Sequence, residues 1–340
     1  MTIQEALART TRNDDLSQDE AFAVMEAIMA GDASDAQIAG LLVALRMKGE
    51  TSDEIAGFAR SMQDRAIRIS ADARPLVDVC GTGGDASGTF NISTTVAFVV
   101  AGAGLPVAKH GNRSVSSRCG SADVLEALGV RLDLSPDDVG RCIDETGIGF
   151  LYAQALHPAM KHAIGPRKEL RLRTVFNLLG PLTNPARAQV QLLGVYDPAR
   201  TEPLAKVLHN LGSEAAFVVH GGGGLDELST LGPNHVARLV DGRVETSLLD
   251  ATSFGLPRSR LADLAGGDAA ENADILRSVL AGSAGPKRDI VLLNAAAVFV
   301  AAGRAKGFSD GLNLAAESVD SGAAGERLDG LVRLTQELGG

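Results

Sequence analysis

The chain has 340 residues and a net charge of −10; 45% of its residues are hydrophobic, 4% are aromatic and none is tryptophan. This length allows one large domain with a smaller companion, and the abundance of small aliphatic residues favours helices packed on a parallel sheet over a β-sandwich. The acidic charge argues against nucleic acid or an acidic membrane as a partner, so a polyanionic ligand must meet local positive charge or a metal.

The first 72 residues are predicted to form a small domain that contains only helices. Ser17, Ser34 and Thr51 are each followed three residues later by Glu or Gln, which is the capping-box pattern of a helix start. Each box opens a run with helical apolar spacing, and Gly31 and Gly49 stand where helix C-terminal caps belong. The three boxes therefore predict three consecutive helices.

Residues 73–340 change to alternating strand and helix patterns, which predict a larger α/β domain. Helical stretches separate several of the apolar runs, and this is the pattern of a mainly parallel sheet. The predicted strands are Leu76–Cys80, Pro106–Lys109, Gly149–Tyr152, Val190–Tyr196 and Ala216–His220.

Three further segments of this domain carry their own predictions. Val236–Leu249 is predicted to be a hairpin that turns at Asp241 and Gly242. The tail from about Asn272 is predicted to be helical, with Ile290–Ala302 buried. Residues 136–175 are predicted to be helical as well, and we expect these helices to pack on the N-terminal domain.

The cysteines and the N-terminal residues indicate the cellular compartment in which the protein is expected. Cys80, Cys119 and Cys142 are odd in number and show no CxxC spacing, which argues against a disulfide or zinc framework. The N-terminus lacks the apolar core of a signal peptide, and no apolar run approaches the roughly 18–20 residues of a membrane span. We expect a soluble cytoplasmic enzyme with no membrane partner.

The segment from Asp78 to Thr95 is the most informative part of the sequence. A predicted strand, a turn with four glycines and a predicted helix follow one another there, an arrangement that exposes backbone N–H groups to an anion. Asp85 together with Asn91, Ser93 and Thr94 adds a dense polar shelf, which suits a ribose, a phosphate and a metal. The segment predicts a phosphorylated ligand.

A dinucleotide site is the main alternative for this turn. Residues 81–86 fit the G-x-G-x-x-A pattern, but that pattern also needs a carboxylate at the end of the next strand for the ribose. The next strand ends in Lys109 and His110, and no Gly-Lys-Ser/Thr of a Walker motif occurs in the chain. These absences argue against an NAD-dependent dehydrogenase and a P-loop enzyme.

Two other loops are expected at the same edge of the sheet. Residues 109–118 combine Lys109, Arg113 and Arg118 with amide and hydroxyl donors, and we interpret them as an anion-binding loop. Residues 221–227 place the adjacent carboxylates Asp226 and Glu227 behind four glycines, where they can ligate a hard cation or, alternatively, cap a helix.

Residues 157–173 form a fourth, basic segment. The segment lacks an HExxH motif, and its two histidines are five residues apart, so it is not a zinc site. Its three arginines and one lysine in residues 167–173 indicate a carboxylate-binding patch, although most of these charges are expected to be solvated or structural.

Taken together, these residues resemble the anthranilate phosphoribosyltransferase family of tryptophan biosynthesis. The resemblance runs over nearly the whole chain and rests on five motifs in order: Asp78–Thr95, Lys109–Asp123, His157–Arg167, Thr174–Pro185 and Gly224–Glu227. It implies a helical domain plus an α/β domain of the nucleoside-phosphorylase and phosphoribosyltransferase type. It also implies an active site between the domains and a homodimer formed through the helical domain.

The resemblance further implies which residues bind the substrates. Phosphoribosyl pyrophosphate (PRPP) would be held by Gly81, Gly84, Asp85, Thr89, Asn91, Ser93, Thr94, Lys109, Ser117 and Ser121. Two Mg²⁺ ions would be bound through Ser93, Asp226 and Glu227, while Asn112 and Arg167 would position anthranilate, with His110 and Gly81 lining that side. Two departures are mild: Gly221–Gly224 is unusually glycine-rich, and Arg171 stands where relatives often have Gly.

The implied reaction needs no nucleophile or base from the protein. The aromatic amine of anthranilate is already neutral near pH 7, and the leaving pyrophosphate would be stabilised by Mg²⁺ and basic donors. Lys109, Asn112 and Arg167 would act by positioning and electrostatics. A pyrimidine nucleoside phosphorylase of the same fold is disfavoured by the Asp226–Glu227 pair, and a nucleic-acid-binding relative is disfavoured by the charge of −10.

Overall fold

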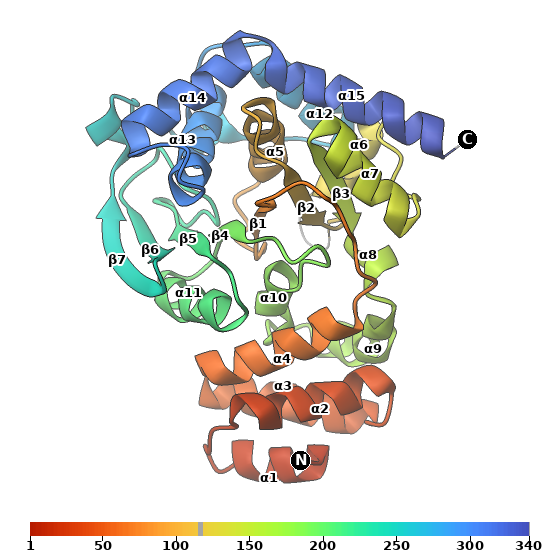
Figure 1. The fold of residues 1–340 in the computed structure, drawn as a ribbon. Coiled ribbons are helices and arrows are strands. Elements are labelled where there is room, and N and C mark those ends of the chain that lie inside the picture. Colours follow the sequence, from red (N-terminus) through yellow and green to blue (C-terminus); the bar gives the residue numbers. More distant parts are fainter. Residues whose placement is uncertain (115–117, 340) are drawn as a thin grey trace.

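The computed structural model describes residues 1–114 and 118–339 and shows a helical layer below a larger α/β body (Figure 1). Four helices form the N-terminal layer: α1 (Ile3–Thr10), α2 (Gln18–Ala30), α3 (Asp35–Lys48) and α4 (Ser52–Arg65). The capping boxes predicted at Ser17, Ser34 and Thr51 are confirmed, and a fourth box at Thr2 opens α1. Helix starts are set by local sequence, so they are readable before the fold is known.

One buried carboxylate is built into this helical layer. The Glu54 side chain is fully buried, and its oxygens accept from the backbone N–H groups of Leu16 (2.9 Å) and Thr51 (2.9 Å). The Lys48 ammonium lies 3.0 Å from Glu54 Oε2 and is itself only 3% exposed. Every strong interaction of this carboxylate is therefore supplied from within the N-terminal layer.

The α/β body is built on a seven-stranded sheet of order β3-β2-β1-β4-β5-β6-β7. The first five strands are parallel, which confirms the predicted sheet, and the last two are antiparallel. The predicted hairpin turn is also confirmed, since Asp241 and Gly242 both have positive φ (49° and 72°). The strands are β1 (Val77–Gly81), β2 (Val107–Gly111), β3 (Ile148–Tyr152), β4 (Val190–Gly194), β5 (Ala215–His220), β6 (Asn234–Val240) and β7 (Arg243–Leu249).

Helices cover both faces of this sheet. On one face α5 (Ile92–Gly102), α6 (Ser121–Ala127), α12 (Ala269–Leu280), α13 (Pro286–Ala301), α14 (Phe308–Asp320) and α15 (Ala323–Leu338) share a core with Val79 and Leu192. On the other, α11 (Thr201–Asn210), the short α10 (Phe176–Leu179) and the N-terminal helices pack against Leu193 and Val218. The predicted burial of Ile290–Ala302 is confirmed for residues 290–300. No helix in the described ranges is long and apolar enough to cross a membrane.

The expectation that residues 136–175 pack on the N-terminal helices is only partly correct. Helix α9 (Lys161–Leu170) does contact α2 and α3. Helix α7 (Pro136–Thr146), in contrast, contacts β3 and α15, and its Val139 and Ile143 share a small core with Leu151 of β3. The physical reason is chain length, because a single residue separates α7 from β3 and holds the helix against the sheet. After β3 the chain forms the short helix α8 (Ala153–Leu156), which precedes α9.

Candidate functional site

The strand order creates a crevice at the carboxyl ends of β1 and β4. From β1 the chain proceeds to β2 and β3 on one side, and then returns to β4 and β5 on the other. In open α/β sheets such a reversal leaves a crevice where ligands bind. The loops that follow β1, β2 and β5 are the three that the sequence singled out, and they emerge at this edge together.

The glycine-rich loop after β1 contacts the loop after β5 directly. The Gly83 N–H donates to Asp226 Oδ2 over 2.7 Å. A Cβ on Gly81 would lie 2.3 Å from the same oxygen, and one on Gly194 would lie 1.5 Å from the Asp226 carbonyl oxygen. Glycine is thus required at both positions for the two loops to meet. Gly83 and Gly84 also adopt positive φ (70° and 79°), which glycine tolerates best.

Glu227 is a buried carboxylate and Asp226 is half-buried beside it, and both have little internal compensation. Burial raises the pKa of Asp226 to about 7, and the nearby Asp85 carboxylate adds to the shift. Burial and then Asp226 raise the pKa of Glu227 well above its ordinary value, while Lys109 opposes this. Neither carboxylate forms an ion pair in residues 1–114 or 118–339.

The start of α5 supplies the polar shelf that was predicted. The Ser93 backbone N–H faces the Glu227 carboxylate and opposes the rise of its pKa. Asn91 occupies the N-cap position without a capping bond, and its Oδ1 accepts from Asn272 Nδ2 (2.9 Å). The Thr94 hydroxyl is buried and has no hydrogen-bond partner in the part of the chain that the structure describes. Thr89, farther back in the loop, forms a β-bridge with Ala265.

Lys109 joins the loops after β1 and β2. Its side chain is buried, and its Nζ donates to the Val79 carbonyl (2.6 Å) and to Ser93 Oγ (3.4 Å). Because Lys109 also acts electrostatically on Glu227, the amine, the Ser93 hydroxyl and the carboxylate form one cluster. The structure therefore brings together Ser93, Lys109, Asp226 and Glu227, which the sequence placed on three separate loops.

The rest of the loop after β2 differs from its predicted character. Arg113, expected to supply free positive charge, is neutralised by Asp123 (3.0 Å) and Glu126 of α6. Asn112 is exposed, and its Oδ1 accepts from Gln154 Nε2 (3.2 Å). Ser121 Oγ donates to the Asn112 carbonyl (3.2 Å). Ser117 lies outside the described residues, so its predicted role is neither supported nor opposed.

A pair of buried histidines lies at the end of β2. His110 Nδ1 lies 3.1 Å from the Gly180 carbonyl and therefore carries a proton that it donates, so His110 Nε2 accepts from His157 Nε2–H over 3.2 Å. Burial lowers the pKa of His110 to about 3, with His157 and Lys109 contributing, and burial lowers the pKa of His157 to about 4. Both rings are neutral at pH 7.

Arg167 lies in the last turn of α9. Its guanidinium stacks over the Phe176 ring at 5.1 Å, and desolvation lowers its pKa. It has neither an ion pair nor a hydrogen bond to any described residue, which leaves its donors available to an anionic ligand. A desolvated arginine of this kind suits a carboxylate, which it can bind in a bidentate manner.

Asp78 and Asn184, which the sequence analysis gave no individual role, and Arg173 of the basic segment hold the site in shape. Asp78 is fully buried in β1 and accepts from the His110 N–H (3.1 Å) and from Asn184 Nδ2 (2.7 Å). Arg173 donates to the Gly84 carbonyl and stacks on the Tyr196 ring at 4.4 Å. A charged residue in the middle of a predicted buried strand was the signal that could have identified Asp78.

Family models match both parts of the chain. The model described as the glycosyl transferase family helical bundle domain matches residues 4–66, and the a/b domain of the same family matches residues 73–325. Among curated proteins, the anthranilate phosphoribosyltransferase of Moorella thermoacetica is 56% identical over 330 residues and covers 97% of each chain. That of Pelotomaculum thermopropionicum is 55% identical over 336 residues, covering 99% of this chain and 97% of its own length.

Solved structures agree with these sequence relatives. The anthranilate phosphoribosyltransferase of Thermus thermophilus superposes with a TM-score of 0.93 at 46% identity, covering 97% of this chain and 99% of that one. The Saccharomyces cerevisiae enzyme in complex with PRPP and Mg gives 0.90 at 28% identity, covering 99% and 98%. The same yeast enzyme with 4-fluoroanthranilate gives 0.87 at 27% identity, covering 99% of each chain.

Proposed function

The chain belongs to the anthranilate phosphoribosyltransferase family, and on that premise we propose that its three loops and α9 carry out the family's reaction. The phosphoribosyl group of PRPP is transferred to the amine of anthranilate, giving N-(5-phosphoribosyl)anthranilate and pyrophosphate in tryptophan biosynthesis. The observation that carries the residue assignment is the cluster of Ser93, Lys109, Asp226 and Glu227, where three separate loops meet.

The donor lies along the loop after β1 and the start of α5. The N–H groups of this loop and of the α5 N-terminus face the phosphates, as helix N-termini do in other phosphate sites. The buried Lys109 ammonium adds the positive charge that an acidic protein otherwise lacks, and the unpartnered Thr94 hydroxyl offers one more donor. The assigned residues are Gly81, Gly84, Asp85, Thr89, Asn91, Ser93, Thr94, Lys109, Ser117 and Ser121.

Mg²⁺ fits the oxygen-rich side of this cluster. The half-buried Asp226 and the buried Glu227 have no ion-pair partner in the described ranges, so a cation would relieve the raised pKa of both. In these ranges no three carboxylate, histidine or cysteine side chains form a ready-made cage, which suits Mg²⁺ because it keeps waters and binds substrate phosphates. We assign two ions to Ser93, Asp226 and Glu227. Bound Mg²⁺ supplies neutralisation of the pyrophosphate charge.

Anthranilate lies between α9 and the end of β2. Arg167 binds its carboxylate, and Asn112 holds the ring near the ribose, with His110 and Gly81 lining the site. A ring whose conjugate acid has a pKa of about 3 is a poor base at pH 7, so His110 does not remove the amine proton in the transition state. Rate acceleration then comes from positioning, which can lower a barrier by roughly 7–11 kcal/mol, and from charge stabilisation at the leaving group.

The direct test combines the protein with PRPP, Mg²⁺ and anthranilate and follows the loss of anthranilate fluorescence. We expect loss that requires all three components and stops when Mg²⁺ is chelated. A protein that leaves anthranilate unchanged but cleaves a pyrimidine nucleoside with phosphate would contradict the proposal and favour a nucleoside phosphorylase.

Assembly and compartment complete the proposal. We assign the chain to the cytoplasm, as a homodimer formed through the helical layer. Met47 of α3 is 84% exposed and Ile164 of α9 is 42% exposed, and these two helices contact each other. Light scattering after size exclusion tests the assembly: the wild type is expected at twice the 35.1 kDa chain mass, and Met47→Glu is expected to shift it toward the monomer.

A further inference from the structure

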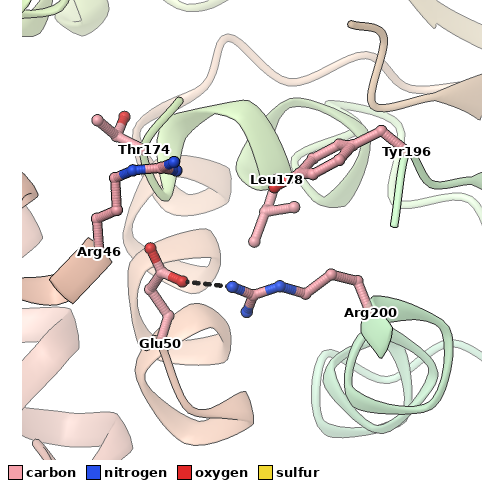
Figure 2. Close-up of a pocket in the computed structure, with 6 residues that line it drawn as sticks. All are labelled: Arg46, Glu50, Thr174, Leu178, Tyr196 and Arg200. Atoms are coloured by element: carbon pink, nitrogen blue, oxygen red, sulfur yellow. Dashed lines mark hydrogen bonds and ion pairs between the residues drawn. The ribbon is translucent and has the colours of Figure 1, made fainter. Parts of the chain in front are cut away.

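A second polar pocket lies at the junction of the helical layer and the α/β body, apart from the site described above. Figure 2 shows six residues around it: Arg46, Glu50, Thr174, Leu178, Tyr196 and Arg200. Its volume is about 210 Å³. None of the six belongs to the donor, acceptor or metal groups assigned above, so the proposed reaction does not account for this pocket.

Arginines from both parts of the molecule face the pocket. Arg46 comes from α3, and Arg200 comes from the turn before α11. Figure 2 shows the Arg46 guanidinium and the Glu50–Arg200 pair around the same space. Arg200 Nη2 lies 3.0 Å from Glu50 Oε2, and the Glu50 side chain is only 4% exposed, which fixes the direction of the Arg200 side chain.

The pocket keeps an excess of positive charge. Glu50 is the single carboxylate among the lining residues and faces two guanidinium groups, and Arg173 adds a third beside them on the Tyr196 ring. Arg46 Nη1 donates to the Arg173 carbonyl (2.8 Å), and the remaining donors of this guanidinium have no protein partner in the described ranges. In a chain of net charge −10, such a local excess of positive charge favours an anionic ligand.

A buried hydroxyl gives an independent indication of a ligand. Thr174 is 5% exposed, lines the pocket, and its Oγ1 has no hydrogen-bond partner among the residues that the structure describes. Buried polar atoms in proteins are nearly always hydrogen-bonded, so an orphan at a pocket wall indicates a missing partner. Two guanidinium groups and a hydroxyl offer donors from several directions, which suits a tetrahedral oxyanion better than a planar carboxylate.

We propose that this pocket binds a phosphate-type oxyanion between Arg46 and Arg200 and thereby links the helical layer to the α/β body. A volume of about 210 Å³ is large enough for a small tetrahedral anion together with waters. Binding is also connected to the donor loop, because Arg46 donates to the Arg173 carbonyl and Arg173 donates to the Gly84 carbonyl. By holding Arg46 in place, the bound anion also positions Arg173, which contacts the glycine-rich loop at Gly84.

Crystals of the wild-type protein soaked in selenate test the location without reference to activity. Selenate is tetrahedral like phosphate and gives an anomalous signal. We expect a peak within hydrogen-bonding distance of both the Arg46 and the Arg200 guanidinium groups. Crystals that show selenate at the donor loops but none in this pocket would overturn the inference and leave the proposed reaction untouched.

Inorganic phosphate then tests the affinity in solution. Thermal unfolding is followed over a phosphate titration, with PRPP and Mg²⁺ present at saturation so that the donor site is occupied. We expect the wild type and the matched control Arg304→Gln, an exposed arginine far along the chain, to gain stability with phosphate. Arg46→Gln and Arg200→Gln should each weaken the phosphate dependence by at least about tenfold in apparent Kd.

A charge-preserving variant separates anion binding from damage to the fold. Arg200→Lys can keep the ion pair with Glu50 and should retain most of the phosphate dependence that Arg200→Gln loses. If the double variant Arg46→Gln/Arg200→Gln shows the same phosphate dependence as the wild type, the pocket is not an anion site. If the wild type itself shows no dependence with the donor site filled, the inference is equally wrong.

Discussion

Two buried carboxylate sites in this protein have opposite electrostatics. In the helical layer, Glu54 accepts from two backbone N–H groups and lies 3.0 Å from the Lys48 ammonium. At the edge of the sheet, Asp226 and Glu227 repel each other, and burial raises the pKa of both. The first carboxylate is compensated by its own domain, while the second pair has no ion-pair partner among the described residues and, in the proposed function, is compensated by Mg²⁺.

This difference separates a structural charge from a functional one. A buried ion that is paired and hydrogen-bonded is costly to disrupt, because removal of one partner leaves the other buried and uncompensated. Buried carboxylates without a counter-ion weaken the fold, so their presence indicates a ligand that repays the cost in free energy. Burial alone does not distinguish the two cases; the partners do.

We expect the Asp226–Glu227 site and the Glu54 site to differ most in how their substitution affects turnover. Asp226→Asn combined with Glu227→Gln removes the carboxylates assigned to Mg²⁺, and we expect kcat to fall about 10³-fold, since metal and preorganised charge contribute several kcal/mol. The free energy of unfolding without Mg²⁺ should not fall, because no internal ion pair is lost. Steady-state rates and urea unfolding measure both. Asp274→Asn, an exposed carboxylate on α12, is the control and should change neither.

Glu54 is expected to behave in the reverse way. Glu54→Gln leaves the buried Lys48 ammonium with less compensation and should lower the free energy of unfolding by about 3 kcal/mol. The rate per folded molecule should stay near that of the wild type. The neighbouring exposed Asp53→Asn serves as the matched control. A fall in kcat without a fall in stability would remove the distinction between the two sites.

Burial of a titratable group also makes the free energy of unfolding depend on pH, and the histidine pair tests this. The pKa of His157 is about 4 in the folded protein and near 6.5 when unfolded, so the unfolded state binds more protons between these values. Stability is therefore lost as the pH falls from about 6.5 to 4. His157→Gln should reduce the difference in unfolding free energy between pH 7 and pH 5 by about 2 kcal/mol. An unchanged difference would show that His157 is already solvated.

The smallest expected effect concerns the acceptor. Arg167→Gln should raise the KM for anthranilate by about tenfold through loss of a charge-assisted hydrogen bond, with the KM for PRPP unchanged. Lys168→Gln, the exposed next residue on α9, is the matched control. A rise confined to the KM for PRPP would place Arg167 at the donor instead.

Local patterns in the sequence were sufficient for much of the fold. The boxes at Ser17, Ser34 and Thr51 and the turn at Asp241–Gly242 depend on contacts within a few residues, and all are confirmed. The parallel strands follow from alternating apolar runs and helices. Helix α7 was misplaced because the pattern shows that a helix is amphipathic but not which neighbour covers its apolar face.

The site was predictable only as a set of loops. Their meeting at one edge follows from parallel topology, whereas the bonds within it join residues far apart in sequence. Asn184 reaches Asp78 across 106 positions, and Gly83 reaches Asp226 across 143. The neutralisation of Arg113 by Glu126 needs the position of α6 relative to the loop, which composition does not contain. The sequence shows which loop residues are charged, but it does not show which residue forms an ion pair with each of them.

The contact between Gly194 and the Asp226 carbonyl has a consequence for mutational scanning of this protein. A methyl group at position 194 would lie 1.5 Å from that oxygen, so even alanine forces the loop after β5 away from the sheet. In a saturation library selected for growth without tryptophan, every amino-acid substitution at this position should be depleted, while synonymous codons should not. Residue 194 would then score like an active-site residue although it presents no functional group to any substrate.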